Sequence, residues 1–507
     1  LDLTRLLPGP VATLHLADMG ADVIKIEDHG AGDYARVLGD GPDGVSIFYR
    51  SVNRNKRGLR LDLKRAQGRE VLLRLARTAD ILVESFRPGV SDRLGIGYHV
   101  LRVLNPRIVY CAITGYGQTG PLAMAAGHDL NYIGLAGVLD QIGVDGGPPA
   151  IPNLQVGDLL GGAMTAVMGI LAALFDAQRS GQGRLVDVAM SEAVLSHNLF
   201  PLFALQGGGA VPARGTDRLS GADPGYRVYA TADGRYMAVA PLEKKFWEVF
   251  CEALERPAWK TQHGQYGAAA VALSREMECL FASHDQAYWA DFFAGIDCCV
   301  TPVLAVAEAL EHPQFLTRGM AVQADGITQY APPVRMSGWV FAVERSAPGC
   351  GEHSGEVLRE AGEANLGGKV LVDISNPLDF SHGMPPTLLV KDTDSLGEQV
   401  QRAFPSTRVV KTLNTLNADL MVHPDTLPEP TTVFVSGDDA AAKAVVSGLL
   451  RSFGHTDVLD LGDLLVAVKP GPQNLDTVFC RMSVADTIPY AINQIPYLPA
   501  YVSLSTS

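Results

Sequence analysis

Alternating apolar runs divide the start of the chain into strands and helices. Residues 1–27 indicate a strand, a Pro8-Gly9-Pro10 turn, a helix at 11–19 and a buried strand at 21–27. This β-α-β unit lacks the Gly-x-Gly-x-x-Gly phosphate turn, so the pattern favours a nucleotide-like α/β scaffold over a dinucleotide site. Because residue 1 already lies inside a predicted strand, we expect the natural chain to begin earlier.

The same alternation continues for about 200 residues. A helix at 66–78, a strand at 80–84 and a strand at 107–114 precede a long apolar helix that starts at Asp158 and ends near Gly181. We therefore predict an α/β class with a Rossmann-like large domain. Arg87 follows a strand directly, at the edge where α/β sheets bind ligands.

Later changes of pattern predict the domain organisation. A hairpin around Asp233-Gly234 opens a smaller α+β region, and a Pro- and Gly-rich segment follows it. Strands and helices then resume from Lys369 to Leu461. The predicted parts are a large α/β domain (1–209), a small α+β domain (210–330), a segment returning to the large domain (331–362), a partial Rossmann-like α/β unit (363–465) and an unassigned tail (466–507).

Charge narrows the choice of partners. The 507 residues carry a net charge of -14, with a pI near 5.3, which disfavours nucleic acid and anionic membranes. The stretch 50–65 is an exception, with seven Lys and Arg residues and one Asp. It is either a solvated loop or a phosphate-binding rim.

Cysteine usage and hydropathy indicate the compartment. The seven cysteines show no Cys-x-x-Cys spacing and no dense disulfide framework, so a reducing cytoplasm is expected. Cys298 and Cys299 are adjacent and are read as inert thiols rather than a redox pair. The longest apolar run, 163–175, is too short to span a bilayer, so no membrane association is predicted.

His128 and Asp158 are the candidate proton carriers. Both sit at predicted helix starts, and a His with a carboxylate on the opposite face is a suitable pair for moving protons on carbon. On chemistry alone each residue is better explained as a helix cap or a buried polar group, because Gly-Asp before an apolar run is an ordinary N-cap.

Several short sequence motifs, which follow one another along the chain, favour the catalytic interpretation of these two residues. Residues 1 to about 350 resemble the family III CoA transferases, and within them the α-methylacyl-CoA racemases. The matching words are Leu6-Leu-Pro-Gly-Pro10, Leu16-Ala-Asp-Met-Gly-Ala-Asp-Val-Ile-Lys-Ile-Glu27, Glu84-Ser-Phe-Arg-Pro-Gly89, Thr114-Gly-Tyr-Gly-Gln-Thr-Gly-Pro121, Ala126-Gly-His-Asp129 and Val300-Thr-Pro-Val-Leu304.

The resemblance implies a reaction and its catalytic residues. It implies racemisation or epimerisation at the α-carbon of 2-methyl-branched acyl-CoA thioesters, through an enolate and without a cofactor or metal. His128 and Asp158 would face the α-carbon, and Glu243, in the word Tyr236-Met-Ala-Val-Ala-Pro-Leu-Glu243, would assist the histidine. The family also implies an interlocked homodimer.

The resemblance also implies a site for the CoA part of the substrate. Arginines that meet the CoA phosphates would do so through their bidentate guanidinium groups. The residues implied in CoA binding are Arg54, Arg57, Asp62, Lys64, Arg87 and Gly127.

Two alternatives stay open. In the first, Asp158 is the covalent nucleophile of a CoA transferase. The glycine-rich loop of such transferases is replaced here by Leu219-Ser-Gly-Ala-Asp-Pro-Gly225, which argues mildly against it. In the second, the chain is a bifunctional fusion with an NADP-dependent oxidoreductase, because the words from Gly368 to Asp379 and Val409 to Asn417 resemble deazaflavin-type NADP reductases. The glycine turn of that domain is absent, so we expect no nicotinamide binding.

Overall fold

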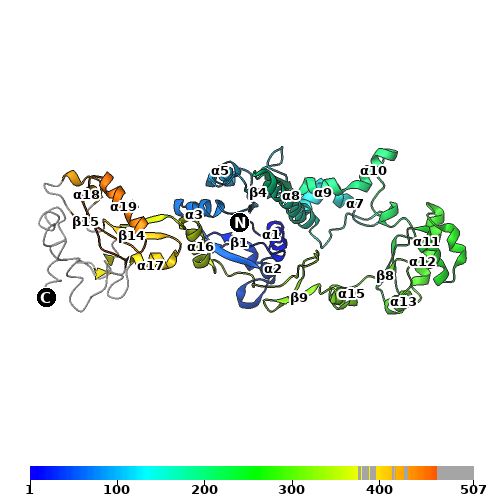
Figure 1. The fold of residues 1–507 in the computed structure, drawn as a ribbon. Helices are drawn as coiled ribbons and strands as arrows, with labels where there is room; N and C mark the ends of the chain where they lie inside the picture. The colour runs from blue at the N-terminus through cyan, green and yellow to red at the C-terminus, as the bar shows by residue number, and fades with distance from the viewer. Residues whose placement is uncertain are drawn as a thin grey trace. The chain divides into compact units, whose positions relative to one another are not determined.

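The computed structural model describes residues 1–374, 396–413, 418–426 and 432–464, together with residues 378, 379, 387, 388 and 416. The chain folds as two compact units, Leu1–Ser354 and Gly355–Ser507 (Figure 1). The second unit begins inside the segment that the sequence assigns to the return path of the first.

A parallel sheet forms the centre of the first unit. β1 pairs with β2, and β4 pairs with both β3 and β5. Asp2 joins these two groups, since it bridges Lys25 of β1 on one side and Val83 of β3 on the other. The strands are β1 (Val23–Glu27), β2 (Lys56–Arg60), β3 (Ile81–Glu84), β4 (Val109–Thr114) and β5 (Leu185–Ala189).

The order of these strands confirms the Rossmann-like prediction. Across the sheet they run β2, β1, residues 1–3, β3, β4, β5, which in chain order is 3-2-1-4-5-6. This is the order of dinucleotide-binding folds, and its topological switch point lies between residues 1–3 and β3. The short strand predicted at Leu1-Asp-Leu is therefore present, as a bridge to both neighbours.

Helices enclose the sheet. Ala12 and Leu16 of α1 share one buried cluster with Ala166 and Ile170 of α8 and with the strand residue Cys111. The helices up to residue 208 are α1 (Pro8–Asp18), α2 (Ile47–Ser51), α3 (Ala66–Ala76), α4 (Val90–Leu94), α5 (Tyr98–Leu104), α6 (Asp129–Leu135), α7 (Val138–Gln141), the π-helix η3 (Gly157–Met164), α8 (Thr165–Ser180), α9 (Met190–His197) and α10 (Leu199–Gly208).

The long apolar helix lies where the sequence predicts it. η3 and α8 form one run, Gly157–Ser180, which by length and composition alone is long and apolar enough to cross a membrane. One face of the run packs in the core of the unit, through residues such as Ala163, Ala166 and Ile170. The other face leaves an apolar stripe exposed, consisting of Leu160, Met164, Met168, Leu171 and Phe175.

The centre of the basic stretch at 50–65 differs from both structures predicted for the stretch. Its central part is the buried strand β2. Lys56 is fully buried, and its Nζ lies 3.1 Å from Asp2 Oδ2 and donates to the Asn53 side chain and the Pro10 carbonyl. Beside it, Lys25 Nζ lies 2.8 Å from the equally buried Asp33 Oδ2. The charges of Arg54, Lys56 and Arg57 therefore lie inside the fold as ion pairs. Arg60, Lys64 and Arg65 are exposed.

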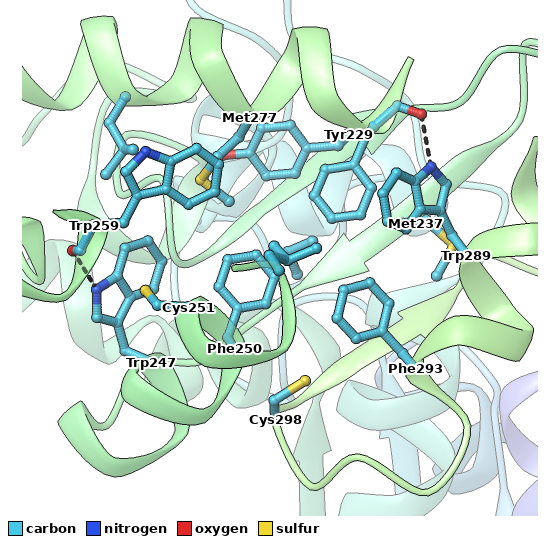
Figure 2. Close-up of a cluster of buried hydrophobic side chains, with 14 residues drawn as sticks. Tyr229, Met237, Trp247, Phe250, Cys251, Trp259, Met277, Trp289, Phe293 and Cys298 are labelled. Atoms are coloured by element: carbon cyan, nitrogen blue, oxygen red, sulfur yellow. Dashed lines mark hydrogen bonds between the residues drawn. The ribbon is translucent and has the colours of Figure 1, made fainter. Parts of the chain in front are cut away.

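The small domain has an aromatic core. An antiparallel sheet of order β6-β7-β8 is built from Arg227–Ala230, Tyr236–Val239 and Val300–Pro302, with the predicted turn at Gly234. Figure 2 shows Trp247 and Trp289 with their indole N–H groups donating to the carbonyls of Trp259 and Phe281. The domain's α-helices are α11 (Lys244–Ala253), α12 (Ala268–Phe281), α13 (Gln286–Phe293), α14 (Val306–Glu311) and α15 (Pro313–Thr317).

After the small domain the chain bonds again to the start of the large domain. After the hairpin β9 (Ala321–Ala324) and β10 (Ile327–Tyr330), Asn55 N donates to Arg345 O at 2.9 Å and Tyr49 Oη donates to Pro348 O at 3.1 Å. These bonds attach the Pro- and Gly-rich segment along the end of α2 and the start of β2.

The second unit contains the strands predicted for it. β11 (Val370–Asp373), β14 (Arg408–Thr412), β15 (Thr432–Ser436) and β16 (Asp457–Asp460) form one sheet in that order, with β14 and β15 antiparallel. Val446 and Leu450 of α19 pack on Val433 and Val435. The helices are α16 (Ser354–Leu366), α17 (Leu396–Ala403), α18 (Ala418–Val422) and α19 (Ala440–Ser452), and the tail at 466–507 lies outside the described residues.

Lys56→Ala should destabilise the first unit by about 3 to 5 kcal/mol, because it leaves the buried Asp2 carboxylate without its cation. Urea unfolding followed by tryptophan fluorescence measures the loss. Lys64→Ala is the matched control: its side chain is exposed, and a surface substitution should change stability by less than about 0.5 kcal/mol. Equal effects of the two substitutions would contradict the assignment of Lys56 to the core.

Candidate active site

The switch point of the sheet defines where a ligand would bind. In open α/β sheets the crevice lies outside the carboxyl ends of the strands at this point, here after Leu3 and after Glu84. Arg87 follows β3 in a turn closed by a 3.1 Å bond from Val90 N to Arg87 O, with Gly89 in the left-handed region at φ 78°. Arg87 is exposed, and within the described residues no hydrogen bond or ion pair is recorded for its guanidinium group.

Two further exposed basic groups follow strands of this sheet. Arg93, which the sequence analysis did not single out, is exposed on α4, and its Nη1 lies 3.5 Å from where a Cβ on Gly89 would stand. Lys64 is exposed at the turn after β2, where Asp62 accepts its backbone N–H at 3.0 Å. Asp62 also lies 3.3 Å from the Arg65 Nε.

Arg54 and Arg57 are occupied within the fold. Arg54 is buried, and its guanidinium donates to both Asp18 carboxylate oxygens, to Gln329 Oε1 and to the Tyr330 carbonyl. Arg57 is also buried and forms two hydrogen bonds to Asp22. Their prediction as phosphate ligands is therefore not supported, because their donors bond instead to α1, to the turn before β1 and to β10.

His128 begins α6. It is the N-cap residue, with extended backbone at φ -130°, and its N–H donates to Asn131 Oδ1 at 3.0 Å. The imidazole is exposed. The preceding residue, Gly127, has no room for a side chain, because a Cβ there would come within 2.7 Å of Tyr132 and 2.8 Å of Tyr116 Oη.

Asp158 lies inside a helical turn, which corrects its prediction as an N-cap. It is the second residue of η3, and the N-cap of that element is Val156. Its own N–H donates to Asp129 Oδ1 at 3.0 Å, so the first turn of η3 is attached to the first turn of α6. π-Helical turns are rare and concentrate at functional sites, because the wider turn redirects a side chain.

Three charged groups from these two elements influence one another. Burial raises the pKa of Asp158 to about 6, the Asp129 carboxylate adds to the rise, and His128 opposes it. Burial likewise raises the pKa of Tyr132 to about 12, with Asp158 as its next cause. The arrangement thus holds a partly exposed carboxyl group that titrates near neutrality beside a histidine, which is suitable for general acid-base chemistry.

Glu243 is positioned separately from this pair. It is the N-cap residue of α11 in the small domain, and its recorded electrostatic neighbour is Cys299, whose pKa is raised by burial and then by Glu243. Among the described residues no interaction joins Glu243 to His128 or Asp158. Among the residues that the structure describes, no three or more His, Cys, Asp and Glu side chains are grouped so that they could hold a metal ion.

The fold agrees with the result of comparison with known families. Residues 1–354 match CoA-transferase family III, and the chain belongs to that family. The human α-methylacyl-CoA racemase is 34% identical over 365 residues, 71% of this chain and 91% of the relative. An acetyl-CoA:oxalate CoA-transferase of Acetobacter aceti is 33% identical, with 71% and 93% covered.

Solved structures agree on the fold. A CAIB/BAIF family protein of Brucella suis has a TM-score of 0.63 and 27% identity, covering 71% of this chain and 97% of its own. A putative NADP-reductase of an Arthrobacter species is 56% identical over 27% of this chain and 62% of its own, with a TM-score of 0.23. The resemblance of the C-terminal part to such reductases is thereby present in sequence, and the TM-score is too low to extend it to structure.

Asp158→Asn should stabilise the protein at pH 8 by about 1 to 2 kcal/mol. The folded state raises the pKa of this carboxyl from 3.8 to about 6, so it disfavours the ionised form; the penalty is absent below the unfolded value and complete above pH 6. Partial exposure reduces its size. Urea midpoints at pH 3.5 and 8 measure the effect, with the exposed pair member Asp176→Asn as a control that should shift little. A gain at pH 3.5 equal to that at pH 8 would contradict the titration.

Proposed function

We propose that this protein is an acyl-CoA racemase or epimerase that acts at the α-carbon of 2-methyl-branched acyl-CoA thioesters. The observation that carries the proposal is the coupled pair of His128 and Asp158 at adjoining helix starts, with the pKa of the carboxyl raised to about 6. A thioester α-proton is removed only when the enolate oxygen is stabilised, and oriented N–H groups at helix starts supply this.

The steps balance between the two side chains. Asp158 as carboxylate takes the α-proton, so the C–H bond breaks and its electron pair enters the enolate. Protonated His128 then delivers its proton to the opposite face of the same carbon. The enzyme is left with a neutral Asp158 and a neutral His128, the state that accepts the opposite enantiomer, so the roles exchange for the reverse reaction. No cofactor is needed in this scheme.

The CoA part of the substrate is assigned to the switch point. Arg87 is our main candidate for its phosphates, with Arg93, Lys64 and the backbone at Asp62 and Gly127 as further contacts. Exposure of Arg87, Arg93 and Lys64 at the carboxyl ends of the strands supports this assignment. Arg54 and Arg57 are not part of the proposed phosphate site, because their guanidinium groups are paired with Asp18 and Asp22.

A homodimer is part of the proposal. The exposed apolar stripe from Leu160 to Phe175 repeats at helical spacing, and α10 exposes Phe200 and Phe203 as well. A surface of this kind favours a second copy of the chain as its cover. We infer that Glu243 joins His128 across such a dimer. Six of the seven cysteines lie among the described residues, where they are free thiols and three of them are buried, which fits a cytoplasmic location.

CoA transfer through a covalent intermediate on Asp158 is the second candidate function. It stays a candidate because a racemase and a CoA-transferase match this chain at nearly the same sequence identity, 34% and 33%. Where the transferases close a glycine-rich loop, this chain has the 3-10 turn η4 (Arg218–Ser220), with Arg218 3.2 Å from Asp223. That difference favours the racemase. The bifunctional NADP-dependent alternative rests on sequence resemblance alone.

Isotope exchange separates the two candidate functions. A single enantiomer of 2-methylacyl-CoA, incubated with the enzyme in heavy water, should racemise and gain one deuterium at the α-carbon, because the enolate is reprotonated from solvent-exchanged side chains. Mass spectrometry and chiral analysis of the product measure both. Transfer of CoA to acetate or another free acid, with no deuterium in the acyl chain, would establish the transferase instead.

His128→Ala and Asp158→Asn should each reduce kcat by roughly 10² to 10⁴, the usual effect of losing a general acid or base. The Kd for free CoA should stay within about threefold, since neither group meets the phosphates. Steady-state racemisation and calorimetric CoA binding measure the two effects. Asp176→Asn, on the exposed side of α8, is the control for charge loss. Near-normal turnover by Asp158→Asn would return this residue to a structural role.

A further inference from the structure

Glu84 occupies an unusual place for an acid. It is the last residue of β3, at the carboxyl end of a strand that borders the switch point, and only 2% of it is exposed. Nothing in the proposed proton transfer uses it. A buried carboxyl group at this edge needs an explanation, because a carboxylate costs stability when it is taken out of water.

Three hydrogen bonds hold the Glu84 carboxyl group. Oε2 accepts the N–H of Phe86 at 2.5 Å, and Oε1 accepts the hydroxyl of Tyr110 on β4 at 3.3 Å. The side chain of Ser91, buried in the first turn of α4, also bonds to it. Phe86 begins the turn that carries Arg87, and Ser91 follows its end, so one side chain fixes both ends of this turn and attaches it to the sheet.

The turn between these points is otherwise short and exposed. Its internal bond runs from Val90 N to Arg87 O, and Gly89 takes the left-handed conformation that lets the chain enter α4. The side chains of Arg87 in the turn and of Arg93 on α4 are both exposed. The direction in which Arg87 points therefore depends on where Phe86 and Ser91 are held.

The charge on Glu84 is consistent with a functional placement. Burial raises its pKa to about 7, opposed by the Phe86 N–H and the Tyr110 hydroxyl, while Asp92 on α4 adds to the rise. The charged neighbour on α4 is thus another acid. An apolar residue would fill the space with less loss of stability, but it would accept no N–H or hydroxyl donor from the turn.

We propose that Glu84 is a positioning residue that holds the turn at residues 85–90 so that Arg87 meets the phosphates of CoA. The inference rests on the proposed function, because it assigns the CoA phosphates to Arg87. It predicts that Glu84 acts on CoA affinity through Arg87, with no direct part in proton transfer.

A double-mutant cycle on free CoA tests this coupling. Calorimetric Kd values are measured at pH 7 for the full chain and for Glu84→Ala, Arg87→Ala and the double variant. Each single substitution should weaken CoA binding by about tenfold or more, and the double variant should be no weaker than Arg87→Ala alone, because the turn has nothing left to position. Racemisation should show a raised KM with kcat within about threefold.

Two matched variants separate positioning from general damage. Glu84→Gln keeps an oxygen for the Phe86 N–H, so it should restore CoA affinity to within about threefold of the natural chain. Ser91→Ala removes only the bond at the end of the turn, and its effect should also vanish in the Arg87→Ala background. Glu70→Gln, an exposed acid paired with Arg74 on α3, is the control that should leave Kd unchanged.

The outcomes are distinct. An unchanged Kd in both Glu84→Ala and Ser91→Ala, or effects that multiply with Arg87→Ala, would overturn the positioning role while leaving CoA binding at Arg87 intact. An unchanged Kd in Arg87→Ala would overturn the site assignment itself. If Glu84→Ala does not fold, the Ser91→Ala cycle and the recovery in Glu84→Gln decide the question in the same way.

Discussion

The pairing of buried charges around Asp2 is the constraint on which the rest of the first unit depends. Asp2 belongs to the short central strand, and its carboxylate takes the ammonium group of Lys56 from β2, while Lys25 from β1 is paired with Asp33. These groups are fully buried, so each is stable there only when its partner is present. The pairs therefore specify which strands are neighbours, and the strand order in turn creates the switch point where Glu84, Arg87 and the start of α1 meet.

The large-domain fold could be predicted wherever apolar periodicity carried the information. The β-α-β start, the strands that became β3 and β4, and the return of strands after Lys369 all follow from local pattern. β2 could not be found in this way. Its residues Lys56-Arg-Gly-Leu-Arg60 are mostly charged, and what makes them a buried strand is the set of acids at positions 2, 18 and 22, which lie far away in the chain.

The candidate site was predictable in its residues more than in its geometry. The words around His128 and Asp158 identify them, and the start of α6 at His128 follows from the sequence. The π-helical turn that moves Asp158 off the N-cap position does not, because it depends on the bond from its N–H to Asp129 and on close contact with α9. Glu243 shows the other limit: its motif places it in the small domain, and no local signal says what it faces there.

Asp158 and Glu84 show how one physical cause serves two uses. Burial raises the pKa of both carboxyl groups toward neutrality, to about 6 and about 7. Asp158 is partly exposed and has one acid and one histidine beside it, so in the proposed reaction a substrate carbon can approach it and exchange a proton with it. Glu84 is closed to solvent and held by three donors, so it has no path to a substrate. Accessibility, rather than pKa, is what separates a group that transfers protons from one that fixes a turn, and the same criterion removes Arg54 and Arg57 from the phosphate site while it retains Arg87.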